Sequence, residues 1–113
     1  MAMTDSGFKV LIVDDTEEQY VLIRYYLNRT SHQFHQIDHA ADYQTAREII
    51  TRREHYLYLV DYYLGQRDGL ELIHEAVSQG CTAPMLLITG ASDSRIAISA
   101  IRSGAIDYLD KTE

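Results

Sequence analysis

The sequence predicts an α/β fold in which helices cover both faces of an open, parallel, five-stranded sheet. Apolar runs of strand length alternate along the chain with segments whose apolar residues recur at helical spacing. Strands that alternate with helices are joined by right-handed crossovers and pair in parallel. The 113 residues are enough for one domain with one hydrophobic core.

Five strands and four helices are expected in alternation. Near-continuous apolar runs are typical of parallel strands buried on both faces, whereas the second run is of mixed polarity and is expected at an edge of the sheet. The expected strands comprise residues 8–15, 33–40, 56–61, 85–89 and 105–109. The expected helices run from about 17 to 29, from 43 to the polar turn at 52–55, from 70 to Gly80, and from 94 to Gly104.

Capping residues and apolar stripes justify the expected helices. Thr16 and Gln19 have the spacing of a capping box, and Asp42 is a favourable N-cap for the second helix. Gly80 is expected to end the third helix as its C-cap. The side chains expected to face the core are Tyr20, Ile23 and Leu27, flanked by Leu22 and Tyr26, then Tyr43, Ala46, Ile49 and Ile50, then Leu70, Ile73, Ala76 and Val77, and finally Ala97, Ala100 and Ile101.

Charge and cysteine content restrict the class of partner and the compartment. The 17 acidic and 10 basic residues give a formal net charge of −7, which disfavours direct binding to nucleic acid or to an anionic membrane. The single cysteine, Cys81, cannot form an internal disulfide, so a cytoplasmic protein is expected. No apolar run approaches the length of a membrane span, and residues 1–7 are expected to be a disordered leader.

Polar side chains follow four of the expected strands. In a parallel sheet these strand ends share the carboxyl edge, where open α/β sheets bind their ligands. Carboxylates about 4 Å apart repel by roughly 4 kcal/mol per pair at an effective dielectric near 20, and a lysine or a hard divalent cation such as Mg²⁺ would offset this repulsion. The side chains expected to meet are Asp14 and Asp15 after the first strand, Asp61 after the third, Thr89 after the fourth and Lys111 after the fifth.

Phosphoryl transfer is the chemistry that this combination suits. A carboxylate beside Mg²⁺ and a lysine can accept a phosphoryl group, since positioning and charge neutralisation supply most of the catalysis. Asp61 ends the central strand and is therefore the expected nucleophile. The Thr89 hydroxyl and the backbone N–H groups of Gly90 and Ala91 could donate to the aspartyl phosphate product.

Four short motifs occur in a characteristic order along the chain. They are the pair Asp14-Asp15, the Asp61 loop that closes with Asp68-Gly69, the triplet Ile88-Thr89-Gly90, and the segment from Asp107 to Lys111 that contains Tyr108. In this order the chain resembles the receiver domain of bacterial two-component response regulators. The resemblance covers about residues 8 to 111 and implies a flavodoxin-like sheet with strand order 2-1-3-4-5.

The resemblance implies a phosphorylation switch in two-component signalling or a phosphorelay. Asp61 would accept a phosphoryl group from the phosphohistidine of a sensor histidine kinase or a histidine phosphotransfer protein, with Mg²⁺ as cofactor and Mn²⁺ as a substitute. Such a domain is a phospho-acceptor rather than an enzyme, because it promotes only its own phosphoryl transfer and autodephosphorylation. The implied residue roles are metal binding by Asp15, Asp61 and the Tyr63 backbone carbonyl, metal contact through water by Asp14, phosphate contact by Lys111, and switching by Thr89 and Tyr108.

The resemblance also sets an expectation for domain organisation. Residues 8–113 would be a receiver domain that lacks its fifth helix, the one expected after Lys111, so the chain is expected to be a fragment of a longer protein with an output domain. Gly65 and Thr112 stand where the family often has proline, which alters the expected loop geometry but not the acceptor chemistry.

Other functions fit the sequence less well. A pseudo-receiver that switches by protein contact alone, without phosphorylation, would not need the complete set of acidic residues, Thr89 and Lys111. Phosphatases with an aspartyl-phosphate intermediate typically carry a second aspartate two residues after the nucleophile, where this chain has Tyr63. A dinucleotide-binding unit is disfavoured because carboxylates rather than glycines follow the first strand.

Three histidines near the second strand allow two interpretations. His32, His35 and His39 have spacings compatible with a metal site, but an exposed edge strand with polar side chains is the preferred interpretation.

Overall fold

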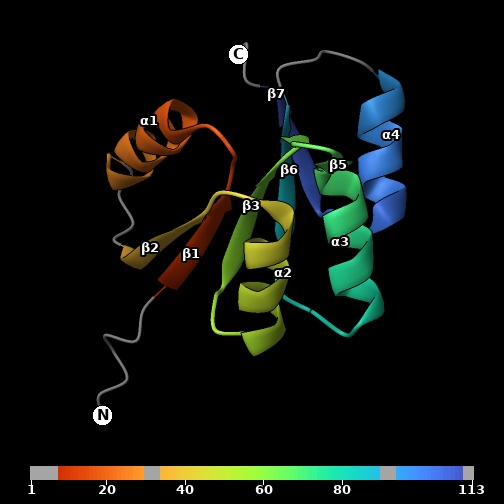
Figure 1. Cartoon of the computed structure of the whole chain (residues 1–113), viewed down its shortest axis with the longest axis horizontal. Coiled ribbons are helices and arrows are strands. Elements are labelled where there is room, and N and C mark those ends of the chain that lie inside the picture. The colour runs from red at the N-terminus through yellow and green to blue at the C-terminus, as the bar shows by residue number, and fades with distance from the viewer. Residues whose placement is uncertain (1–7, 30–33, 90–93, 111–113) are drawn as a thin grey trace.

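The computed structural model describes residues 8–29, 34–89 and 94–110, and they form a three-layer α/β domain (Figure 1). All neighbouring strands of the main sheet pair in parallel, in the order β2-β1-β3-β6-β7. Counting only these five strands in chain order, the arrangement is 2-1-3-4-5, which confirms the predicted fold. The strands are β1 (Phe8–Val13), β2 (Phe34–Ala40), β3 (Leu57–Asp61), β6 (Met85–Thr89) and β7 (Asp107–Asp110).

Four helices connect the strands of the main sheet. Figure 1 shows α2, α3 and α4 side by side along the sheet, with α1 apart from them near β1 and β2. None of the helices in the described ranges is long and apolar enough to cross a membrane. The helices are α1 (Glu17–Asn28), α2 (Tyr43–Arg52), α3 (Gly69–Ser78) and α4 (Ser94–Ser103).

The two faces of the sheet bury different amounts of apolar surface. On one face, side chains of β1, β3 and β6 pack with α2, α3 and α4 in a large cluster that includes Leu11, Tyr58 and Ile73. On the other face the buried cluster of the described residues comprises Val10, Ile12, Leu59 and Ile88, which α1 covers with half-buried side chains. No residue of α1 is buried, and its Leu22 and Tyr26 are exposed, contrary to the prediction that they flank the core.

A short hairpin between β3 and α3 was not predicted. Its strands are β4 (Tyr63–Leu64) and β5 (Arg67–Asp68), which pair antiparallel around the two-residue turn at 65–66. Gly65 has a φ of +73°, as the first central residue of a type II′ hairpin turn requires. The glycine that stands where the family often has proline thus has a structural role in this turn.

Several details of the predicted helices were wrong, and one is Val77 of α3, which was expected to face the core but is 39% exposed. Thr16 makes no side-chain capping bond to α1, and its hydroxyl donates to Asp15 Oδ1 at 3.3 Å. On α4, Ile101 is 55% exposed, whereas Ile96 packs against the core beside the fully buried Ala100. The Asp42 cap of α2 is confirmed, since its side chain accepts from the Thr45 N–H at 2.7 Å.

Candidate functional site

Three carboxylates lie together at the carboxyl edge of the sheet. The register pairs Val13 of β1 with Val60 of β3, which places the next residue of each strand, Asp14 and Asp61, next to each other. One oxygen from each of Asp14, Asp15 and Asp61 lies within 4.8 Å of the others. Asp14 and Asp61 are buried, whereas Asp15 is exposed. The predicted acidic cluster is therefore brought together, with one side open to solvent.

The turn after β1 holds Asp14 by its backbone and by its side chain. The Asp14 N–H donates to the carbonyl of Ala40 at 3.0 Å, which extends the pairing of β1 with β2. The Asp14 Oδ1 accepts from the Thr16 N–H at 2.9 Å, a local turn stabilised by an aspartate side chain. Asp15 follows on the outside of this turn, so its carboxylate reaches the cluster from the solvent side.

The loop after Asp61 is fixed by its contacts with α3 and β6. The Tyr62 N–H donates to the Ile88 carbonyl at 2.9 Å, and the Tyr62 carbonyl accepts from the Gly69 N–H at 2.8 Å. A Cβ atom at Gly69 would lie 2.3 Å from the Asp61 carbonyl oxygen, so a side chain larger than hydrogen does not fit without movement. Gly69 is therefore a positional requirement of the Asp61 loop.

Helix α3 begins with a capping box that the sequence analysis did not identify. The Asp68 side chain accepts from the Glu71 N–H at 2.9 Å, and the Glu71 side chain accepts from the Asp68 N–H at 3.1 Å. The Asp-x-x-Glu spacing is a known signal of this arrangement and was available in the sequence. It fixes the start of α3 directly after the hairpin.

The remaining predicted site residues are described to different extents. Thr89 is fully buried at the end of β6 and pairs in register with Asp110. Tyr108 lies on β7 opposite Leu87, and only its backbone is described. Tyr63 lies on β4, two residues from Asp61, with a 57% exposed side chain. Lys111, Gly90 and Ala91 lie outside the described residues.

The donor set at the acidic cluster fits a hard divalent cation. Carboxylate oxygens are the ligands that Mg²⁺ and Ca²⁺ prefer, and Mg²⁺ is usually held by one or two of them together with water. At 4.8 Å and an effective dielectric near 20, two of these carboxylates repel by about 3.5 kcal/mol. Binding of a cation would remove that repulsion, and the exposed side at Asp15 leaves an entry path.

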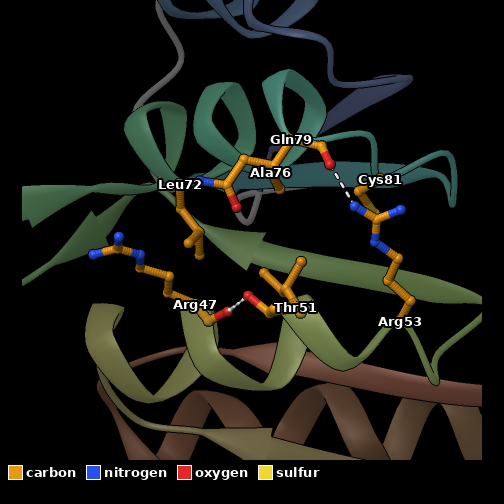
Figure 2. A pocket seen from close by; sticks show the side chains of 8 residues that line it. Arg47, Thr51, Arg53, Leu72, Ala76, Gln79 and Cys81 are labelled. Atoms are coloured by element: carbon orange, nitrogen blue, oxygen red, sulfur yellow. Dashed lines mark hydrogen bonds between the residues drawn. The ribbon is translucent and has the colours of Figure 1, made fainter.

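The hollows found elsewhere on the described surface do not contribute to this chemistry. One lies between α2 and α3, lined by residues that include Arg47, Leu72 and Cys81 (Figure 2), and has a volume of about 30 Å³. That volume has room for one or two water molecules. Figure 2 also shows Arg53 donating to the Gln79 carbonyl across its rim. A larger hollow of about 260 Å³ lies at the amino ends of β3 and β6, opposite the carboxylates.

The described histidines near β2, which are His39 on the strand and His55 just before β3, do not lie together in a metal site. His39 Nε2 lies 2.8 Å from the Asp14 carbonyl oxygen, and the His39 ring stacks on Tyr20 with a centroid distance of 4.1 Å. His32 and the His35 side chain lie outside the described part of the chain. His55 is buried and its Nε2 pairs with Asp38 Oδ2 at 2.7 Å. His39 is thus half-buried and contacts the acidic turn, which an exposed edge strand would not predict.

Asp38 precedes His39 on β2, so its side chain lies on the opposite face of the strand, where it pairs with His55. Burial would raise the pKa of Asp38, but hydrogen bonds from Gln36 and His55 and the charges of His55 and Lys9 together lower this pKa below its ordinary value of 3.8. The carboxylate therefore stays ionised at neutral pH and holds the buried imidazole at the start of β3.

Comparison with known proteins gives a consistent result. The family model described as the response regulator receiver domain matches residues 10–113. The transcriptional regulatory protein GltR of Pseudomonas aeruginosa is 31% identical over 111 residues, which cover 96% of this chain and 45% of that protein. The two-component response regulator PhoP of the same organism is 32% identical, over 91% of this chain and 44% of that protein. The chain thus spans less than half the length of these relatives.

Solved structures share the fold. The receiver domain of NtrX from Brucella abortus is 31% identical, with a TM-score of 0.79 over 92% of this chain and 86% of that one. A response regulator from Burkholderia pseudomallei, solved with a phosphorylated aspartic acid, calcium ion and citrate, is 25% identical, with a TM-score of 0.80 over 94% of this chain and 61% of that one.

Proposed function

Because the chain belongs to the response regulator receiver domain family, we propose that it is a phosphorylation switch whose phospho-acceptor is Asp61. Receiver domains act as signalling domains of two-component systems. The observation that carries the proposal is the position of Asp61, a buried carboxylate at the end of the central strand β3 with Asp14 and Asp15 beside it. A related response regulator has been solved with a phosphorylated aspartic acid, which supports the assignment.

The proposed reaction moves a phosphoryl group from nitrogen to oxygen. An Asp61 carboxylate oxygen attacks the phosphorus of a phosphohistidine on a sensor histidine kinase or histidine phosphotransfer protein. The new P–O bond forms as the P–N bond breaks, and the electron pair of that bond stays on the imidazole, which takes up a proton. Later hydrolysis of the acyl phosphate by water returns Asp61 and inorganic phosphate. The chain would thus promote only its own phosphorylation and autodephosphorylation.

The acidic cluster would hold Mg²⁺ or, as a substitute, Mn²⁺. Asp15, Asp61 and the Tyr63 backbone carbonyl are the proposed ligands, with Asp14 in contact through water. The bound cation would supply charge neutralisation for the carboxylates and for the transferred phosphoryl oxygens. The clustering of three carboxylate oxygens within 4.8 Å supports this role.

Thr89, Tyr108 and Lys111 would together convert phosphorylation into a conformational change. The Thr89 hydroxyl would turn toward the phosphate, Lys111 would pair with a phosphate oxygen, and Tyr108 would move behind Thr89. Full burial of Thr89 at the end of β6 and its pairing with β7 support a coupled movement.

We further propose that the domain acts in the cytoplasm and that residues 8–113 belong to a longer protein with a fifth helix and an output domain.

The test is labelling by a small phosphoryl donor. Acetyl phosphate with Mg²⁺ should add one phosphoryl group to the wild-type chain, measured by intact-protein mass spectrometry, and Asp61→Asn should abolish this addition. The label should be lost on treatment with hydroxylamine, as an acyl phosphate is. Full, acid-stable labelling of Asp61→Asn would refute the proposal. A folded wild type that binds Mg²⁺ but takes no label would instead indicate a pseudo-receiver, which works by protein contact alone.

A further inference from the structure

The turn that carries Asp14 and Asp15 is held by a side chain from the neighbouring strand. The Asp14 carbonyl oxygen can only accept a hydrogen bond, so His39 Nε2, 2.8 Å away, must carry the proton and donate it. Residues 14 and 39 are 25 positions apart in the chain, so this bond is a tertiary contact and not a property of the turn itself.

The backbone of Asp14 is therefore fixed from both sides by the end of β2. Its N–H donates to the Ala40 carbonyl at 3.0 Å, and its carbonyl accepts from His39. These two bonds orient the peptide groups before and after the Asp14 Cα atom. The second of these peptide groups leads into Asp15, whose carboxylate joins the cluster from the exposed side of the turn. Loss of the His39 bond would free this peptide group to rotate.

Helix α1 in turn fixes the His39 ring. Tyr20 stacks on it with a centroid distance of 4.1 Å and an interplanar angle of 7°. The Tyr20 N–H donates to the Thr16 carbonyl at 3.2 Å, and the Thr16 N–H donates to Asp14 Oδ1 at 2.9 Å. The contacts close a ring from Asp14 through Thr16 and Tyr20 to His39 and back to Asp14.

We propose that His39 is a positioning residue for the metal site, which holds the Asp14-Asp15 turn in the geometry that binds a divalent cation, with Tyr20 holding its ring. This inference rests on the proposed function, because that function supplies the metal. His39 contacts neither the cation nor the phosphoryl group and acts through the Asp14 backbone. Partners that orient metal-binding groups in this way typically change metal affinity by about 10-fold or more when they are removed.

The experiment compares Mg²⁺ affinity and metal-free hydrogen exchange in variants of the 113-residue chain. His39→Phe keeps a ring beside Tyr20 but removes the donor, and calorimetry should show Mg²⁺ binding roughly 10-fold weaker than in the wild type. His39→Gln can restore an N–H donor and should recover part of the affinity. Without metal, the Thr16 amide, which donates to Asp14 Oδ1 in the same turn, should exchange faster in His39→Phe than in the wild type. His74→Phe, at an exposed position of α3, is the matched control and should change neither quantity.

The outcomes separate positioning from general packing. Wild-type values of Mg²⁺ affinity and of Thr16 amide exchange in His39→Phe would overturn the proposal. An equal loss of affinity in Ile23→Ala, which removes another α1 contact on the same sheet face, would overturn it too. If His39→Phe does not fold, Tyr20→Leu provides the test, because it keeps the His39 donor and removes the stacked ring. An unchanged Mg²⁺ affinity in Tyr20→Leu would overturn the proposal. A wild type that binds no Mg²⁺ would refute the proposed function, while the metal-free exchange would still test the role of His39.

Discussion

The two faces of the sheet differ in how they are packed, and the acidic site depends on both. On the face of α2, α3 and α4, a large buried cluster surrounds residues such as Leu11 and Ile73. On the face of α1, four strand residues are buried under side chains that are themselves half-exposed. Asp61 and its loop are fixed from the first face through α3, whereas the Asp14-Asp15 turn leads into α1 on the second. The difference indicates that global stability and site geometry can be changed separately.

The largest expected effect tests the packing of the two faces directly. Ile73→Ala, on the well-packed face, removes a fully buried side chain of α3 and should lower the free energy of unfolding by about 3–4 kcal/mol. Ile23→Ala, on the other face, removes a half-buried side chain of α1 and should cost about 1 kcal/mol. Urea unfolding followed by circular dichroism measures both values. Equal losses would show that the two faces contribute equally and would break the comparison.

A smaller effect is expected where α3 meets the Asp61 loop. Helix propensity alone predicts that Gly69→Ala stabilises α3 by up to about 1 kcal/mol. The added Cβ atom, however, would lie 2.3 Å from the Asp61 carbonyl oxygen and 2.8 Å from Val60 Cγ1, so overpacking should dominate and cost about 2 kcal/mol. Labelling of Asp61 by acetyl phosphate should also slow, because its peptide group must move.

Gly65→Ala is the matched control for that substitution. Nothing lies within 4 Å of its added Cβ atom, so only the positive φ opposes it, at about 1 kcal/mol, and labelling should stay at the wild-type rate. Slower labelling in Gly65→Ala than in Gly69→Ala would contradict a specific role of Gly69 at the site.

The smallest predicted effect concerns pH and the strand β2. The pKa of Asp38 is lowered in the folded state, so ionised Asp38 stabilises the fold above its unfolded pKa near 3.8, and this stabilisation is lost as the pH falls through the folded value. Asp38→Asn keeps the shape and removes the charge. The wild type should therefore exceed the variant in urea stability at pH 7, and the difference should shrink below about pH 4. A difference that grows at low pH would have the wrong sign.

The order of the elements could be predicted because each strand and helix carries its own local signal. The apolar runs of β1 and β3 and the stripe of α2 require no knowledge of neighbours, and they indicated parallel strands that alternate with helices. The strand order, which the structure confirms, came from the family resemblance. The approach of Asp14, Asp15 and Asp61 followed from parallel pairing, since parallel strands end at one edge.

Features that depend on side-chain competition or on distant contacts were missed. The Thr16 hydroxyl donates to the neighbouring Asp15 carboxylate and accepts no capping bond from the first turn of α1, which the spacing of Thr16 and Gln19 does not reveal. The strands β4 and β5 have two residues each, too few for a periodic pattern. The bond from His39 to Asp14 spans 25 positions, so no local pattern could indicate it, and the spacing of His39 with His32 and His35 suggested only a metal site.

The glycine that follows α4 sets how closely the end of that helix approaches α3. Gly104 has a φ of +111°, and a Cβ atom there would lie 2.8 Å from Val77 Cγ2 of α3, so the two helices touch closely at this end. A side chain at position 104 would therefore have to push the end of α4 away from α3.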